Sequence, residues 1–274
     1  METRNQQHVS YRRSAGSVRV VVGVACMLVV GSILPVASAA ETDPKAVLKA
    51  MSDYLAKQPT VAAKINSSIE IVTPDMEKIQ FDSSSTVQLK RPDKLSAERI
   101  GGYAAVRLLF DGKTLTIQDL DKKQYAQVGL NGTIDELVDH MHQDLGLVAP
   151  GADLLLSDVY SALSADMLQA KYIGQGVIDG RECEHLAFRN AESDWQLWVR
   201  TGSDPIPCKM VITSKMVTGA PQYTLEIRDW NTGEAIDDAA FAFNPEGDLK
   251  KIEPKELSGL DELPEPAAQG GAQK

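Results

Sequence analysis

Cys183, His185 and Cys208 are the side chains in the second half of the chain that are best suited to metal or redox chemistry. Cys183 and His185 lie two residues apart in a segment that alternates like a β-strand, so their side chains share a face. Two ligands are too few for zinc, which takes about four. The alternation of 208–214 places Cys208 on the other face. The sequence therefore predicts no metal site here.

A disulfide between Cys183 and Cys208 remains open on the sequence alone. An oxidising compartment favours such a bond. However, we expect one strand to lie between the two cysteines, which would hold their Cα atoms about 9–10 Å apart, against a usual limit of about 7 Å. A β-bulge or a different strand register would bring them within reach.

Other catalytic chemistry has no recognisable motif in this chain. His140 and His142 lie two residues apart on an expected helix, so they point in different directions and do not share a metal. The sequence contains no nucleophile elbow, phosphate-binding loop or zinc-protease helix. The carboxylates are numerous, but no two of them are paired in an apolar setting. We therefore expect no catalytic residue and no cofactor.

Two long segments, 61–72 and 78–90, alternate between apolar and polar residues. The rest of the predicted fold, including the segments that carry the cysteines and histidines, is organised around them. In each of them the apolar residues fall on alternate positions, which predicts a strand with one buried face and one solvated face. Antiparallel sheets tolerate this arrangement. Both segments are longer than the usual strand of about 5–6 residues, so they indicate a strongly curved sheet.

The remaining pattern raises the total to about eleven antiparallel strands with three helical segments. An N-terminal helix is expected at 44–57, with Asp43 as its cap. Apolar residues then recur at helical spacing over 134–147 and 153–167, the only long interruption of the strands. The further strands are expected at 94–100, 104–111, 114–119, 124–128, 171–178, 182–189, 195–200, 208–214 and 222–230. The interruption predicts a plug or lid on the concave side of the sheet.

The apolar face of this sheet predicts the lining of a cavity. We place Phe188 beside Leu197 and Leu186 beside Val199, and we extend the same face to Cys208 and its strand. The expected lining is Ile65, Ile69, Phe81, Val87, Phe110, Leu197, Met210 and Ile212, with Leu137, Met141 and Leu155 as the lid.

The two ends of the chain predict processing and disorder. Four arginines, an uncharged run over 20–36 and a small-x-small site indicate a signal peptide, 1–39, that is cleaved after Ala39. One domain is expected over 42–245, and a disordered Pro-, Glu-, Gly- and Ala-rich tail over 246–274. The net charge of −10 becomes more acidic once the signal is removed, which argues against nucleic-acid binding. We expect a monomer in the periplasm.

Several short motifs resemble a family of predicted periplasmic proteins of unknown function, which is itself similar to the LolA/LolB lipoprotein-carrier superfamily. The motifs are Asp111-Gly112-Lys113-Thr114-Leu115, Pro150-Gly151-Ala152-Asp153-Leu154, Asp194-Trp195-Gln196-Leu197-Trp198, Pro221-Gln222-Tyr223 and Phe241-x-Phe243-x-Pro245-x-Gly247. The resemblance implies an open half-barrel of about eleven antiparallel strands, with helices covering its concave face. The arginine that latches the lid helices in the carriers has no match in this sequence.

The favoured function is therefore a periplasmic carrier that binds a lipid, an acyl chain or a lipoprotein anchor in this cavity. Two alternatives stay open. One is an envelope protein-interaction or sensory module whose cavity is filled permanently by its own helices. The other is an unrecognised hydrolase.

Overall fold

The computed structural model describes residues 42–147, 149–245, 247–261 and 263. The expected signal peptide and its cleavage site lie outside these residues, as do residues 246, 262 and 264–274 of the expected tail. None of the helices in the described part of the chain is long and apolar enough to cross a membrane.

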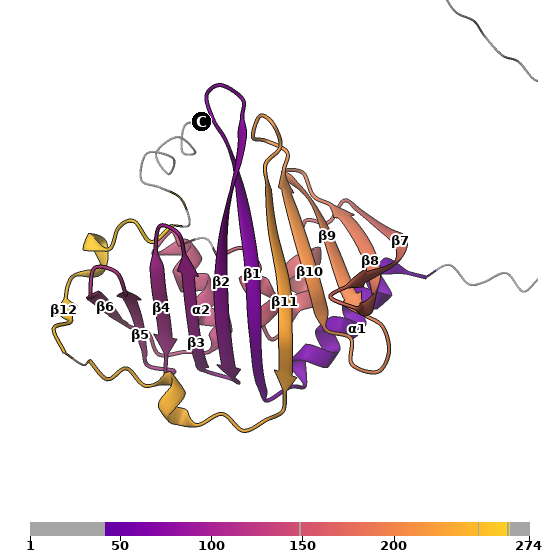
Figure 1. Ribbon diagram of the computed structural model, residues 1–274. Coiled ribbons are helices and arrows are strands. Elements are labelled where there is room, and N and C mark those ends of the chain that lie inside the picture. Colours follow the sequence, from indigo (N-terminus) through magenta and orange to yellow (C-terminus); the bar gives the residue numbers. More distant parts are fainter. Residues whose placement is uncertain (1–41, 148, 246, 262, 264–274) are drawn as a thin grey trace, which may run out of the picture. The chain divides into compact units, whose positions relative to one another are not determined.

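One open, curved sheet of twelve strands forms the domain (Figure 1). Its strand order is β12-β6-β5-β4-β3-β2-β1-β11-β10-β9-β8-β7. All pairs are antiparallel except β12 with β6, so the expected antiparallel meander is confirmed. The strands are β1 Thr60–Val72, β2 Lys78–Lys90, β3 Lys94–Gly101, β4 Ala105–Phe110, β5 Thr114–Asp119, β6 Gln124–Gly129, β7 Gln169–Ile178, β8 Arg181–Arg189, β9 Ser193–Arg200, β10 Pro207–Ser214, β11 Gln222–Thr232 and β12 Lys250–Lys251.

Helical segments cover one face of the sheet, which we call the inner face; the opposite face is the outer face. They are α1 Pro44–Ala56, α2 Ile134–Gln143, the 3₁₀ turn η1 Ala152–Leu155 and α3 Val159–Ser164. As expected, Asp43 caps α1, its carboxylate accepting a hydrogen bond from the Lys45 amide at 2.9 Å. Thr133 and Glu136 form a capping box that begins α2.

The strand pair β1–β2 runs in register over its whole length, from Thr60 opposite Lys90 to Val72 opposite Lys78. No bulge interrupts it, so the alternation seen in the sequence places every odd-numbered residue of both strands on the inner face. Val61, Val87 and Leu89 are buried there by the helices.

Trp230 joins the two hydrophobic clusters of the inner face. One cluster lies under α1 and α3, the other under α2, and Trp230 packs against both. A β-bulge aims it there: the register of β1 with β11 shifts between Ala62 and Lys64, and Asp229 adopts a left-handed conformation with φ of 49°. The extra residue turns the Trp230 ring toward the core, where Nε1 donates to the Pro207 carbonyl at 2.8 Å.

Replacing Asp229 by a β-branched residue should therefore destabilise the domain. We expect Asp229→Val to lower the free energy of unfolding by about 1–2 kcal/mol, the cost of a left-handed conformation for such a residue. The exposed ion pair with Lys64, at 3.1 Å, contributes little. Asp229→Gly is the matched control, because glycine adopts this conformation freely. Urea unfolding measures both, and equal losses for the two variants would contradict the bulge argument.

The expected register of β8 with β9 is wrong by two residues. Leu186 pairs with Leu197, and Phe188 with Trp195. The ring of Phe188 stacks on that of Trp195, with centroids 4.0 Å apart. The cause is the short turn after β8, where the Asn190 amide bonds the Ser193 carbonyl at 2.8 Å and Arg189 pairs with Asp194.

The disordered tail expected from residue 246 is also corrected for part of its length. Within residues 247–261, β12 pairs with β6, and the 3₁₀ turn η3 Pro254–Glu256 follows. Leu257 and Leu260 pack against the cluster under α2, and Arg99 donates a hydrogen bond to the Leu260 carbonyl. Leu257, Leu260 and the hydrogen bond from Arg99 thus hold this segment against the sheet, although its average composition is polar.

Candidate ligand-binding surface

Most of the expected cavity lining is packed against the chain's own helices. Val87, Phe110, Leu197 and Met210 are buried, as is Leu137 of α2. Ile65, Met141, Leu155 and Ile212 are partly buried against the same clusters. These residues form a filled core in this conformation. A ligand could contact them only if the helices moved away from the sheet.

Ile69 and Phe81, the remaining two residues of the expected lining, lie on a different part of the inner face. They pair across β1 and β2, and the next inward pair is Ile71 with Ile79. Among the residues that the structure describes, none of these four belongs to either core cluster. Figure 1 shows this end of the β1–β2 hairpin extending beyond the level of the helices. We call these four residues the open strip.

Apolar side chains of three turns are exposed at the same end of the sheet as the open strip. Tyr103, between β3 and β4, is 55% exposed, and its ring meets that of Phe81 edge-on with centroids 5.3 Å apart. Met76 of the β1–β2 turn and Met216 of the β10–β11 turn are more than half exposed. The last two turns are neighbours, since Lys78 Nζ lies 3.4 Å from the Ala220 carbonyl. Of these exposed side chains, Tyr103 is the one with an observed contact to the open strip.

Arg91 anchors the helical segment to the sheet. It lies in the turn between β2 and β3, and Nη2 donates to the Leu156 carbonyl at 3.1 Å. Burial lowers the pKa of its guanidinium, an effect that the nearby Asp135 carboxylate opposes. Asp135 in turn accepts a hydrogen bond from the Ser157 amide at 2.9 Å. Nε of Arg91 is buried and has no hydrogen-bond partner among the described residues. No sequence pattern indicates this contact, because the arginine and the carbonyl are 65 positions apart.

Removing this guanidinium should loosen the segment between η1 and α3. We expect Arg91→Met to raise amide hydrogen exchange in 152–164 several-fold, and to lower the free energy of unfolding by about 1.5–3 kcal/mol, typical for a hydrogen bond to a charged group. Arg107→Met is the control, because Arg107 forms only a surface ion pair with Glu98. Unchanged exchange in both variants would show that Arg91 does not hold the helices.

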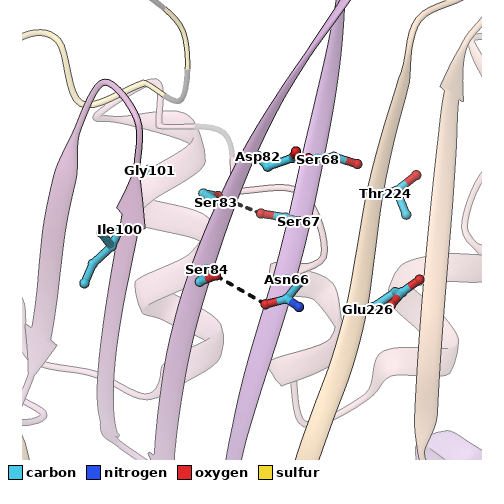
Figure 2. Close-up of a pocket in the computed structure, with 10 residues that line it drawn as sticks. All are labelled: Asn66, Ser67, Ser68, Asp82, Ser83, Ser84, Ile100, Gly101, Thr224 and Glu226. Atoms are coloured by element: carbon cyan, nitrogen blue, oxygen red, sulfur yellow. Dashed lines mark hydrogen bonds between the residues drawn. The ribbon is translucent and has the colours of Figure 1, made fainter. Parts of the chain in front are cut away.

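Two cavities formed by the described residues lie on the outer face. One, of about 440 Å³, crosses β11, β1, β2 and β3 and is lined mainly by small polar side chains (Figure 2). Ser84 bonds Asn66 there at 3.3 Å, and the buried Ser67 and Ser83 hydroxyls bond each other at 2.8 Å beneath it. The second, of about 390 Å³, lies beside residues 234–240. Neither has the apolar walls that the expected ligand requires.

A row of polar and aromatic side chains crosses the outer face beside the first cavity. The rings of His185 and Trp198 stack with centroids 4.0 Å apart, and His185 Nε2 bonds Gln196 at 2.9 Å. Lys209 pairs with Glu226 at 3.1 Å, which lowers the pKa of that carboxyl. The described residues contain no group of three metal-ligating side chains.

The family model of a predicted periplasmic protein family of unknown function (DUF2092) matches residues 44–254. The chain belongs to this family. The match covers every strand and the helices described above, so the expectation from the short motifs is confirmed. A comparison with curated proteins found no match.

Solved structures with a similar course of the chain come from several bacteria. An uncharacterized conserved protein from Thermus thermophilus is 9% identical, with a TM-score of 0.46, covering 76% of this chain and 98% of the other. The lipoprotein LppX of Mycobacterium tuberculosis is 14% identical, with a TM-score of 0.42 and coverages of 72% and 99%. LprF of Mycobacterium bovis is 12% identical, with a TM-score of 0.43 and coverages of 76% and 100%.

Proposed function

We propose that this DUF2092 family member is a periplasmic, non-enzymatic binding or carrier protein for an apolar ligand such as a lipid, an acyl chain or a lipoprotein anchor. The observation that carries the proposal is the open strip. It is an uncovered apolar part of an inner face that is otherwise filled by helices. Ligand sites of this kind combine apolar walls with few polar groups.

The open strip and the core lie on the same face of β1 and β2, with the hydrogen-bonded Ser67–Ser83 pair between them. Ile65 contacts both core clusters and lies two inward positions from Ile69 on the same strand. A chain-like ligand that bound at Ile69 and Phe81 would reach the core by displacing α2 or the η1–α3 segment. Met141 and Leu155 are only partly buried against the cluster under α2, so we expect a ligand that displaced α2 to contact them.

Native mass spectrometry of the protein purified from a periplasm tests the proposal, followed by organic extraction of any adduct. A stoichiometric lipid-sized adduct would support the carrier and identify its cargo class. A clean ligand-free mass, together with no uptake of a fluorescent fatty-acid probe, would overturn it.

A second candidate function, contact with an envelope protein, is favoured by the edge strand β7. This strand ends the sheet and carries a single charged residue, Lys171, among its ten residues. Ile173 and Val177 are more than half exposed along it. An edge strand with few charges and with exposed apolar side chains is a template for pairing with another strand.

In-cell photo-crosslinking distinguishes this candidate from the carrier. A photo-reactive residue at Val177 should give one reproducible cross-linked species. The same residue at Thr86, exposed on the outer face of β2, serves as the control. Identical patterns at both positions would remove the support for a partner at β7.

A further inference from the structure

Cys183 and Cys208 meet in the interior of the protein. Cys183 lies on β8 and Cys208 on β10, and their Sγ atoms are 2.8 Å apart. Their side chains are buried, with exposed fractions of 0% and 2%. A covalent disulfide has an S–S length of about 2.05 Å, so a displacement of less than about 1 Å separates the two thiols from bonding distance.

The end of β9 explains how two strands that are not neighbours bring their cysteines together. Cys183 pairs with Arg200, the last residue of β9. Cys208 lies in a β-bulge, because the register of β10 with β9 shifts between Pro207 and Lys209. The bulge turns the Cys208 side chain toward β8 at the point where the intervening strand stops. The sequence-based face assignment of Cys208 fails for this reason.

The surroundings of the two thiols, as far as the structure describes them, do not favour metal binding or nucleophilic reactivity. The Cys183 thiol approaches the Arg181 carbonyl at 3.6 Å, and the Cys208 thiol approaches the Ile206 carbonyl at 3.8 Å. Burial raises the pKa of Cys183, and raises that of Cys208 to about 12. Burial therefore disfavours the thiolate form of both cysteines and shields them from solvent, unlike reactive or metal-binding cysteines.

We propose that Cys183 and Cys208 form a disulfide that joins β8 to β10 across the end of β9. The reaction is thiol–disulfide exchange with a small or protein disulfide as the oxidant. One cysteine thiolate attacks the oxidant and forms a mixed disulfide, releasing one thiol. The thiolate of the second cysteine then attacks the mixed disulfide, which forms the Cys183–Cys208 bond and releases the second thiol of the oxidant. In total the oxidant gains two electrons and is reduced to two thiols. Because the folded site is shielded, exchange takes place before folding is complete.

Oxidative refolding of the full chain tests this bond. Reduced, denatured protein is refolded with or without oxidised glutathione, denatured again, alkylated and mapped by proteolysis and mass spectrometry. We expect a linked peptide pair containing Cys183 and Cys208, about 2 Da lighter than the two reduced peptides. Adding the same oxidant after folding should give much slower linkage. Full alkylation of both cysteines after oxidative refolding would overturn the proposal.

Thermal unfolding gives a second, independent readout. The bond closes a loop between residues 25 positions apart, which should raise the melting temperature of the oxidised protein about 10 °C above that of the reduced protein. Cys183→Ala and Cys208→Ala should each abolish the dependence on oxidant. If either variant fails to fold, the comparison of oxidised with reduced wild-type protein still decides the question. Equal melting temperatures for mapped, fully linked and fully reduced protein would contradict a stabilising bond.

Discussion

Phe81→Glu should reduce the affinity for a fluorescent fatty-acid probe at least tenfold while leaving the fold intact. Phe81 lies in the open strip, where a carboxylate would have to lose water whenever an apolar ligand bound. The side chain is only partly buried and contributes to neither core cluster. Its main loss is the edge-on contact with Tyr103, a pair of a kind worth about 0.5–1.5 kcal/mol. Probe fluorescence measures the affinity, and circular dichroism checks the fold.

The neighbouring residue provides the matched control for this experiment. Gln80→Glu introduces the same charge one position away, but odd and even residues of β2 point to opposite faces. Gln80 lies on the outer face and bonds Asp82 there at 3.1 Å. Probe binding by this variant should equal that of the wild type. Equal losses in both variants would show that the added negative charge, rather than the inner face, controls binding.

Trp230→Ala should lower the free energy of unfolding by about 3–5 kcal/mol, the usual range for an aromatic residue removed from a core. The ring packs against both clusters, so its loss should leave a cavity where the two halves of the inner face meet. Denaturant unfolding followed by circular dichroism measures this change without depending on tryptophan fluorescence.

Trp230→Phe separates packing from hydrogen bonding at this position. It keeps an aromatic ring but leaves the Pro207 carbonyl without its donor at 2.8 Å. We expect a loss of about 1–2 kcal/mol, clearly smaller than for alanine. If alanine costs no more than phenylalanine, Trp230 does not hold the two clusters together.

Regular strands made much of this fold predictable from the sequence. The β1–β2 pair has no bulge, so strict alternation identified both its buried face and its register. The turn between β8 and β9 also held a usable signal: pairing Arg189 with Asp194, five positions apart, gives the observed register at once. Opposite charges that close a short turn were more informative here than matching apolar residues across the strands.

Irregular backbone and long-range contacts explain what the sequence did not reveal. The bulge at Asp229 reorients the Trp230 side chain, and the bulge at Cys208 reorients the Cys208 side chain. The local amino-acid composition indicates neither bulge. For the candidate site, apolar alternation could not separate core residues such as Leu197 from open-strip residues such as Ile69. That distinction depends on how far the helices extend over the inner face, which is set by tertiary packing.

The two edges of the sheet differ in a way that limits self-association. In the described part of the chain, β12 and η3 lie along β6, and the Tyr125 and Phe243 rings meet with centroids 4.7 Å apart. The edge on that side is thus a strand of only two residues, whereas the other edge is the ten-residue β7. A molecule with one long edge strand has a single extended site for strand pairing, so we expect edge-to-edge growth to stop at two copies. A chain that ended before β12 would have two open edges and could polymerise without limit. By covering the edge of β6, the C-terminal segment would then prevent the protein from assembling into longer polymers.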